Sequence, residues 1–273
     1  MTGWASAEPV VRLSAFVGVL AIVAALEAVA PRRRPGTSRW RRWPGNIGIL
    51  AIDTVLVRLL FPLAAIGVAV IAGDRGWGLL HQLALPGWLT ITLAVIALDL
   101  VIYAQHVGFH AVPWLWRVHR LHHADTELDV TTALRFHPAE IIVSLLIKWA
   151  AIVAIGAPPL AVLIFEILLN AAAMINHGNI ALPAGLDRWL RLVMVTPDMH
   201  RVHHSVAADE RNRNFGFSLP WWDRLFGTYR AQPAAGHAAM TIGLAQFRAP
   251  GDQRIDRMLL QPLRRAEANR GEE

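Results

Sequence analysis

The stretch His119-Arg120-Leu121-His122-His123 is repeated further along the chain, with one Leu-to-Val change, as His200-Arg201-Val202-His203-His204. Positions i, i+3 and i+4 of a helix lie on one face, so each copy predicts a helical surface that directs three imidazoles to a single point. Imidazole nitrogen is the commonest protein ligand for metals such as iron, zinc and copper. The repeat therefore predicts metal binding.

The composition predicts a membrane protein in which histidine, carboxylate or backbone groups must hold any metal ion. Hydrophobic residues make up 55% of the 273 residues, the mean hydropathy is +0.39, and several apolar runs reach the length of about 20 residues that crosses a bilayer. The chain has no cysteine, which excludes disulfides, thiolate zinc sites and iron–sulfur clusters. The net charge of +6 comes almost wholly from arginines beside apolar segments, which favours contact with lipid headgroups over nucleic acid.

Five apolar segments predict membrane helices. They cover about residues 10–30, 47–72, 88–110, 141–157 and 160–175. The first segment lacks a small-residue cleavage site and is followed by Pro31-Arg32-Arg33-Arg34, so it predicts a retained helix rather than a signal peptide. Pro158-Pro159 predicts the tip of a hairpin over residues 141–175, whose arms only just reach a spanning length.

The arginine-rich loop after the first segment sets the predicted topology. Six arginines lie between positions 32 and 42, together with Trp40 and Trp43, which is typical of a cytoplasmic loop. Alternating the later segments from this loop places ten of the twelve histidines on the cytoplasmic side, leaving His81 outside and His237 in a polar tail that we expect to be loose beyond Arg248. Arginine in place of lysine, with abundant alanine and glycine, indicates a GC-rich bacterium and its inner membrane.

The histidine inventory predicts two metal ions. Eight histidines fall in three boxes, and two more are candidate ligands: His106, His110, His119, His122, His123, His200, His203 and His204, then His137 and His177. One ion seldom takes more than about six ligands, so each of two ions would be held by four or five histidines. A helix-entry role is the alternative for His137, because Pro138 follows it. The zinc-protease motif H-E-x-x-H is absent, so iron that activates dioxygen is favoured, with copper and zinc chemically open.

Polar residues near the boxes are candidates for orienting the ligands. Asp99 lies on one helical stripe with Tyr103, His106 and His110, and we expect it to accept a hydrogen bond from the second ring nitrogen of a ligand. The other candidates are Asp125, Asp129, Arg135, Glu140 and Asn214, for which a solvated loop charge is the alternative. Asp223 is a further candidate, as an inward residue of an interfacial amphipathic segment over residues 221–227. In the second apolar segment, Asp53 and Arg58 should face the bundle interior.

Residues 99–229 resemble the fatty acid hydroxylase/sterol desaturase superfamily of membrane di-iron enzymes. The matching motifs are Asp99-x-x-x-Tyr103-x-x-His106-x-x-x-His110, His119-Arg120-Leu121-His122-His123-Ala124-Asp125, Asp129-x-x-Thr132-x-x-Arg135-Phe136-His137-Pro138-x-Glu140, Asn176-His177-x-Asn179, Thr196-Pro197-x-Met199-His200-Arg201-Val202-His203-His204-Ser205, Asn214-Phe215-Gly216 and Trp222-Asp223-Arg224-Leu225-Phe226-Gly227-Thr228. The resemblance adds Asn176 and Asn179 to the candidate residues around the metals. Val107 and Asp198 depart from the family pattern, and we expect any effect on the substrate or donor contact rather than on the ligands.

The resemblance implies an all-α integral membrane protein with four to five transmembrane helices and a cytoplasmic helical cap that carries the boxes. The expected regions are residues 1–86 with the amino-terminal helices, 87–230 as the catalytic domain and 231–273 as the tail. The implied cofactor is two non-haem iron ions, and the implied reaction is oxygen-dependent attack on an unactivated C–H bond of a fatty acyl, sterol, hopanoid or related lipid.

Three functions remain open from the sequence. Hydroxylation leads, desaturation at the same site is the alternative, and a haem- or metal-binding membrane protein without oxygenase activity is the third. The third is disfavoured because the histidines lie at the ends of spans rather than within facing spans. The chain has no dinucleotide fingerprint, cysteine cluster or haem module, so a separate electron donor such as a ferredoxin or reductase is expected.

Overall fold

The computed structural model describes residues 4–61 and 63–264, which form an all-α protein. In these residues extended backbone pairs at two isolated bridges, Pro31 with Ile180 and Ser205 with Ile242, and no strand is formed. Five helical stretches are long and apolar enough to cross a membrane. The predicted all-α fold with four to five candidate membrane helices is confirmed.

The long helices form a bundle, and the shorter ones gather at one end of it. The bundle consists of α1 (Trp4–Val29), α2 (Arg39–Leu60), α3 (Ala65–Asp74), η1 (Leu79–Gln82), α4 (Gly87–Ala111), α6 (Pro138–Ile155) and α7 (Pro159–His177). The other elements are α5 (Pro113–His123), η2 (Thr132–Leu134), α8 (Ala184–Leu190), α9 (Pro197–His203), α10 (Ala208–Arg211), α11 (Trp221–Leu225), α12 (Gly236–Ala239), η3 (Pro250–Gln253), α13 (Ile255–Leu260) and η4 (Gln261–Leu263).

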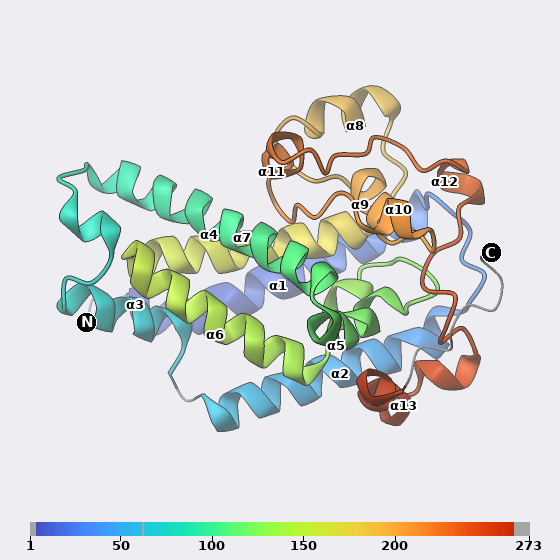
Figure 1. Ribbon diagram of the computed structural model, residues 1–273, viewed down its shortest axis with the longest axis horizontal. Coiled ribbons are helices and arrows are strands. Elements are labelled where there is room, and N and C mark those ends of the chain that lie inside the picture. The colour runs from blue at the N-terminus through green and yellow to red at the C-terminus, as the bar shows by residue number, and fades with distance from the viewer. Residues whose placement is uncertain (1–3, 62, 265–273) are drawn as a thin grey trace.

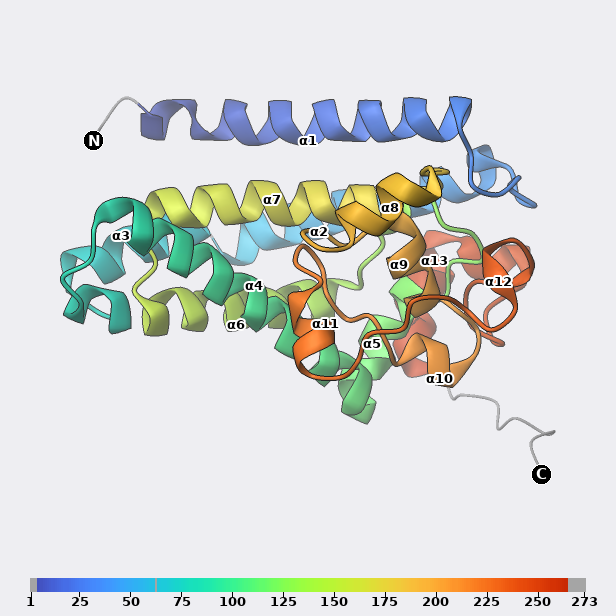
Figure 2. The same ribbon diagram turned by 90° about the horizontal axis from the view of Figure 1, so that it is seen from above.

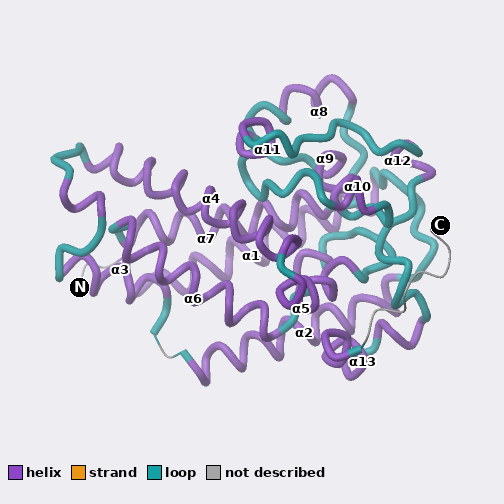
Figure 3. Tube along the Cα trace, in the orientation of Figure 1, coloured by secondary structure: helices purple, strands orange, loops and turns teal. Residues whose placement is uncertain are grey.

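The two ends of the molecule differ in structure. The long helices run along the longest axis, with α3 at one end and the cap elements α8 to α13 at the other (Figure 1). Loops are concentrated at the cap end (Figure 3). Helix α1 lies along one outer edge of the bundle (Figure 2) and packs against α7. The carboxyl ends of α4 and α7 enter the cap, so both deliver residues to it.

The predicted hairpin between the last two apolar segments is formed by α6 and α7. Gly156 ends α6 in the left-handed conformation with φ 73°, and Pro159 is the first residue of α7. The tip packs against Gly78, where an added Cβ would lie 2.1 Å from the backbone nitrogen of Gly156. Glycine is therefore required at both positions, because Gly78 (φ 99°) and Gly156 both have a positive φ and the two backbones approach closely.

The second predicted apolar helix is broken in two. Helix α2 ends at Leu60 and α3 begins at Ala65. Phe61 leaves the helical conformation with φ −131° and ψ 79°, as expected for a residue that precedes a proline in the sequence. On α2, Asp53 is buried as predicted, whereas Arg58 is exposed and the expectation that it faces the interior is wrong.

The carboxyl-terminal segment packs against the bundle, so the expectation of a loose tail beyond Arg248 is wrong for the described residues up to 264. Met258 of α13 is fully buried against Ile49 of α2 and Leu121 of α5. Gly45 of α2 allows the close approach of this segment, because an added Cβ would lie 2.6 Å from the carbonyl oxygen of Gln253. The reason is visible in the sequence only with hindsight: Ile255, Met258 and Leu259 have helical spacing.

A buried ion-pair network joins α2 to the loop after α5. Arg42, 1% exposed, donates from Nε to Asp125 Oδ1 and from Nη2 to Oδ2, both at 2.7 Å, and from Nη1 to Asp129 Oδ2 at 2.7 Å. Burial alone would raise the pKa of Asp125, but the Arg42 guanidinium lowers it to about 2. The predicted arginine-rich loop is partly helical, because α2 begins at Arg39. Asp125 and Asp129 bind Arg42 rather than a histidine.

Replacing Arg42 tests this network. We expect Arg42→Met to lower the free energy of unfolding by roughly 3–5 kcal/mol, because it leaves two buried carboxylates without their cation. Arg41→Met is the matched control, since Arg41 is the exposed neighbour. The measurement is thermal and denaturant unfolding of the purified proteins in the same detergent. Equal stability of the two variants would contradict the assignment.

Candidate metal centre

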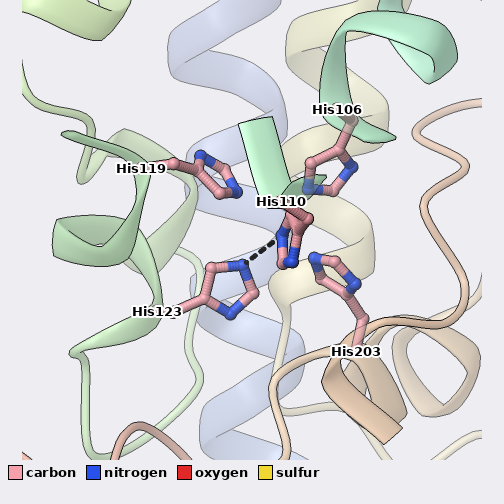
Figure 4. Close-up of side chains that lie close together, drawn as sticks. All are labelled: His106, His110, His119, His123 and His203. Carbon is pink, nitrogen blue, oxygen red and sulfur yellow. Dashed lines mark hydrogen bonds between the residues drawn. The ribbon is translucent and has the colours of Figure 1, made fainter. Parts of the chain in front are cut away.

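Nine of the ten predicted histidine ligands gather in two groups at the cap end of the bundle. Cluster A consists of His106, His110, His119, His123 and His203, and cluster B of His122, His177, His200 and His204. Within each cluster, one ring nitrogen of every histidine lies within 4.8 Å of those of all the others. Figure 4 shows the five imidazoles of cluster A pointing toward one another. Four or five histidines per cluster is the number that the sequence predicted for each of two ions.

Each copy of the repeated motif divides its histidines between the two clusters. From α5, His119 and His123 enter cluster A, while His122 enters cluster B. The expectation that each copy directs three imidazoles to one point is therefore wrong. At about 100° per residue, position i+4 lies about 40° from position i on one side, while i+3 lies about 60° away on the other.

The second copy of the motif, from His200 to His204, makes the same division in the opposite sense. His200 and His204, at i and i+4, enter cluster B, and His203, at i+3, enters cluster A. The repeated sequence thus contributes three histidines to each cluster. Helix α4 completes cluster A with His106 and His110, and the last residue of α7, His177, completes cluster B.

Oxygen acceptors fix the orientation of five of the rings. The Nδ1 contacts are His106 to Phe215 O (2.7 Å), His110 to Asn212 Oδ1 (3.2 Å), His119 to Glu140 Oε1 (2.6 Å), His177 to Ala173 O (2.7 Å) and His203 to Arg213 O (2.8 Å). An oxygen acceptor makes Nδ1 the protonated nitrogen of a neutral ring, so the lone pair is on Nε2. Such outer hydrogen bonds are how metal-binding histidines are usually held.

The Nε2 atoms are spaced as ligands of a common ion would be. In cluster B, the Nε2 atom of His177 lies 3.0 Å, 3.1 Å and 3.2 Å from those of His122, His200 and His204. The ring of His177 already donates through Nδ1, so its Nε2 carries no hydrogen and cannot donate to any of these three neighbours. Nitrogens at adjacent positions about 2.1 Å from one ion would have nearly this separation. The residues present therefore fit a bound metal.

Cluster A fits an ion for the same reason. His110 and His123 approach each other at 3.1 Å between Nε2 atoms. The Nε2 atoms of His106, His119 and His203 are buried and have no hydrogen-bond partner among the described residues. Buried polar atoms without a partner are rare in folded proteins, and a metal ion would satisfy all three.

The box histidines are held in the neutral form that metal binding requires. Burial lowers the pKa of His122, His123, His200, His203 and His204, and their mutual proximity lowers it further. A neutral imidazole offers its lone pair without first losing a proton. At neutral pH all five are therefore ready to bind.

His137, the tenth predicted ligand, is not brought to either cluster. It precedes α6 as the N-cap residue, and its Nδ1 accepts the backbone N–H of Ala139 at 3.1 Å. Its Nε2 lies 3.2 Å from the carbonyl oxygen of Leu259, so both ring nitrogens are occupied. The helix-entry role is the one that the structure shows, and the following proline was its signal in the sequence.

Among the ten polar residues expected around the ligands, Glu140 bonds directly to a cluster histidine, through the 2.6 Å contact to His119. Asp99 instead accepts the indole N–H of Trp222 at 2.9 Å and the backbone N–H of Leu219 at 3.3 Å, so the expected bond to a ligand histidine is not formed. Tyr103 pairs with the hydroxyl of Thr228 at 2.9 Å. These two residues position the cap chain rather than a ligand.

Asp223 acts on a ligand through the backbone. It accepts the backbone N–H groups of Phe215 and Gly216, each at 2.8 Å, and the hydroxyl of Thr228 at 2.6 Å. This fixes the turn whose Phe215 carbonyl accepts the hydrogen bond from His106. The contribution of Asp223 is therefore one step removed from the metal ligand.

The remaining candidates hold segments of the cap. Asn176 donates to Phe217 O, Asn179 exchanges hydrogen bonds with the backbone of Arg33, and Asn214 joins the backbones of Met199 and Arg230. Asn214 does so in the left-handed conformation with φ 53°. Arg135 donates to Leu121 O at 2.8 Å and to Gln253 at 2.6 Å.

Several functional contacts carried no signal that the sequence reasoning used. The carbonyl acceptors at Ala173, Arg213 and Phe215 are backbone groups, which no residue type reveals. Asn212 lies between two arginines in a polar stretch and accepts from His110 only because the cap folds back onto α4.

Two cavities adjoin each other in the bundle, and the inner one reaches cluster A. An inner cavity of about 330 Å³ reaches His106 and His119, and an outer cavity of about 750 Å³ lies between α1, α2 and α7. The two share six lining residues: Phe16, Leu50, Val57, Ile141, Glu166 and Asn170. The lining is mostly apolar, so an apolar chain entering from the bilayer could reach the histidines.

Two adjacent residues provide a sharp test of the clusters. We expect His122→Ala to remove the ion of cluster B and His123→Ala the ion of cluster A, because neighbours in sequence serve different clusters. Each variant should retain one metal ion per chain where the unaltered protein holds two, measured by elemental analysis after reconstitution. His81→Ala, at an exposed position far from both clusters, is the control. Loss of both ions from either single variant would favour one shared site.

Removing the Glu140 carboxylate tests its role in orienting His119. We expect Glu140→Gln to weaken metal binding about 10–100-fold, as loss of such outer partners usually does. Competition with a chelator of known affinity measures the change. Glu127→Gln is the matched control, because Glu127 contacts the backbone of Gly36 and no histidine. Equal affinities in the two variants would show that Glu140 does not support its ligand.

Comparison with known proteins identifies the family. The model for the family described as fatty acid hydroxylase matches residues 91–228, half of the chain. The ornithine lipid hydroxylase OlsE of Rhizobium tropici is 30% identical over 52% of this chain and 42% of its own length. The alkylglycerol monooxygenase of Xenopus tropicalis is 26% identical over 70% of this chain and 42% of its own length, and the cholesterol 25-hydroxylase of Rattus norvegicus is 24% identical over 52% and 47%.

The chain spans less than half the length of each of these relatives. No solved structure matches it significantly. The family match covers the boxes from His106 to His204 and both clusters that they form. The resemblance seen in the motifs is thereby confirmed, and the chain belongs to the fatty acid hydroxylase family.

Proposed function

We propose that this protein is a membrane-bound lipid hydroxylase that holds one iron ion in each histidine cluster. With dioxygen, two protons and two electrons from a separate donor, it would insert one oxygen atom into an unactivated C–H bond and release the other as water. The observation that carries the proposal is the connection between the cavities and cluster A, because it gives an apolar chain a route to His106 and His119. The lipid hydroxylases and monooxygenases among the relatives support the same reaction class.

The donor set supports iron. Nine imidazoles form the two clusters, and no thiolate exists in the chain to favour a softer metal. Iron bound there would supply the binding and reduction of dioxygen that C–H attack requires. Copper and zinc share an affinity for imidazole, so the identity of the metal is part of the experiment.

The chain itself contributes orientation and exclusion of water. Glu140 and the Phe215 carbonyl fix the rings of His119 and His106, the two cluster A ligands that line the inner cavity. Phe136 stacks on His122 with ring centroids 4.5 Å apart and also lines that cavity. Phe136 therefore contacts a cluster B ring and the inner cavity at the same time. A lipid bound in the cavity would therefore meet apolar walls and two oriented ligands.

The arginines before and within the start of α2 support a cytoplasmic position for the cap. Positive residues beside membrane helices favour the cytoplasmic side, and the cap lies at the end of the bundle where α1 finishes and α2 begins (Figure 2). A soluble electron donor would then approach from the cytosol. In a bacterium, which the composition and the rhizobial relative both suit, the membrane would be the inner one.

Labelled oxygen tests the proposal. We expect the iron-loaded protein in lipid nanodiscs, given a reductant and ¹⁸O₂, to yield a lipid with one added labelled oxygen atom, detected by mass spectrometry. His203→Ala, which removes a ligand from cluster A, should form none. A lipid that has instead lost two hydrogens would identify a desaturase. A protein that holds two irons per chain, takes electrons and alters no lipid from cell extracts would overturn the proposal.

A further inference from the structure

A group of four charged side chains lies inside the membrane part of the bundle, away from the cap. Glu166 of α7 forms ion pairs with Lys148 of α6 and with Arg12 of α1, and Arg12 also pairs with Glu8. We call these four residues the membrane ion cluster. Lys148 is the sole lysine of the whole chain. None of the four belongs to the metal clusters.

The membrane ion cluster lies at the junction of the two cavities. Lys148 and Glu166 line the inner cavity, and Glu8, Arg12 and Glu166 line the outer one. Both ends of the inner cavity are therefore polar. Cluster A histidines lie at one end and the ion cluster lies where a chain from the bilayer would enter.

Helix geometry gives the separation of these two ends. Lys148 follows Glu140, the partner of His119, by eight residues of α6, which is about 12 Å at 1.5 Å per residue. Glu166 precedes His177 by eleven residues of α7, about 16 Å. The ion cluster is thus roughly 12–16 Å from the histidines along the bundle.

Fold stability alone does not account for charges at this position. Moving ions from water into an apolar interior is costly, and a buried ion pair is often no more stable than apolar residues of the same volume. Ionisable residues within membrane helices are accordingly rare and usually functional. Here the side chains of Lys148 and Glu166 are 19% and 10% exposed, and both residues line the inner cavity.

Hydrogen-bond donors remain at the cavity wall. The Lys148 ammonium has three N–H donors, and among the described residues Glu166 is its one hydrogen-bond partner. Ser144, one turn from Lys148 and one turn from Glu140, continues a polar stripe along the same face of α6. It receives the side-chain N–H of Gln105 at 2.9 Å, and Gln105 Oε1 is buried without a partner.

We propose that Lys148, held by Glu166, binds an oxygen-bearing polar group of the lipid, a carboxylate or an ester carbonyl, at the cavity junction. The consequence of this binding is the choice of the carbon that reacts, and that consequence rests on the proposed function. With carbon–carbon bonds of about 1.5 Å, an extended chain advances roughly 1.3 Å per carbon, so about ten carbons would separate the bound group from the carbon at the histidines.

Binding of matched lipids tests this assignment without turnover. The probes are hexadecanoic acid, its methyl ester and hexadecane, titrated by native mass spectrometry into the full chain in detergent, without reductant. We expect the acid, the ester or both to bind about tenfold more tightly than hexadecane, the magnitude of one charge-assisted hydrogen bond. The acid alone would identify a carboxylate site, and both would identify a carbonyl site.

Variants test whether Lys148 causes the tighter binding of the oxygen-bearing lipids. Lys148→Met should remove this preference over hexadecane, and Lys148→Arg should keep it. Leu145→Met, in the wall of the same cavity, should leave the preference unchanged. If Lys148→Met does not fold, Lys148→Met/Glu166→Gln removes both partners of the pair and tests the same point. Equal binding of the three probes by the unaltered protein, or an undiminished preference after loss of the ammonium, would overturn the proposal.

The two proposals can fail separately. A protein that keeps the lipid preference but hydroxylates nothing contradicts the proposed function alone. A protein that hydroxylates lipid but binds hexadecane as tightly as the acid contradicts the role of Lys148 alone.

Discussion

Nine imidazoles packed with their ring nitrogens facing one another form the constraint on which the rest of the structure depends. In cluster B the lone pair of His177 faces three neighbouring nitrogens at 3.0–3.2 Å, an arrangement that is unfavourable until a cation lies between them. Metal binding and folding of the cap are therefore coupled. Outer hydrogen bonds such as the one from His119 to Glu140 hold the rings in place for the ion.

The polar network around the clusters joins distant parts of the chain. Arg42 on α2 binds Asp125, which lies two residues after His123, and Asp223 fixes the turn that supports His106. Arg135 carries the network to Gln253 in the carboxyl-terminal segment. The cap is thereby tied to the bundle by buried ionic and amide groups, whose loss leaves unpaired charges. Rigid placement of the ligands follows from this network.

The membrane part provides access and selection. Apolar residues form most of the two cavities, so they suit a lipid chain, while the pair of Lys148 and Glu166 adds a polar point at their junction. A lysine ammonium inside a bilayer discriminates between a hydrocarbon and a chain bearing an acceptor oxygen. The reason is that an N–H donor left without a hydrogen-bond acceptor in an apolar environment costs free energy. The distance along α6 between Lys148 and the histidines then determines which carbon of the substrate lies at the histidines.

The sequence by itself determined the helical membrane fold, the hairpin at Pro158-Pro159 and nine histidines that the structure gathers, because apolar length and helical spacing are local properties. Tertiary structure alone decided how each copy of the repeated motif divides between the two clusters, since that depends on which helix lies on either side. It also decided the partners of Asp99 and Asp125, the capping role of His137 and the packing of the tail. Each of these depends on residues far apart in the chain, whose contact no local pattern encodes.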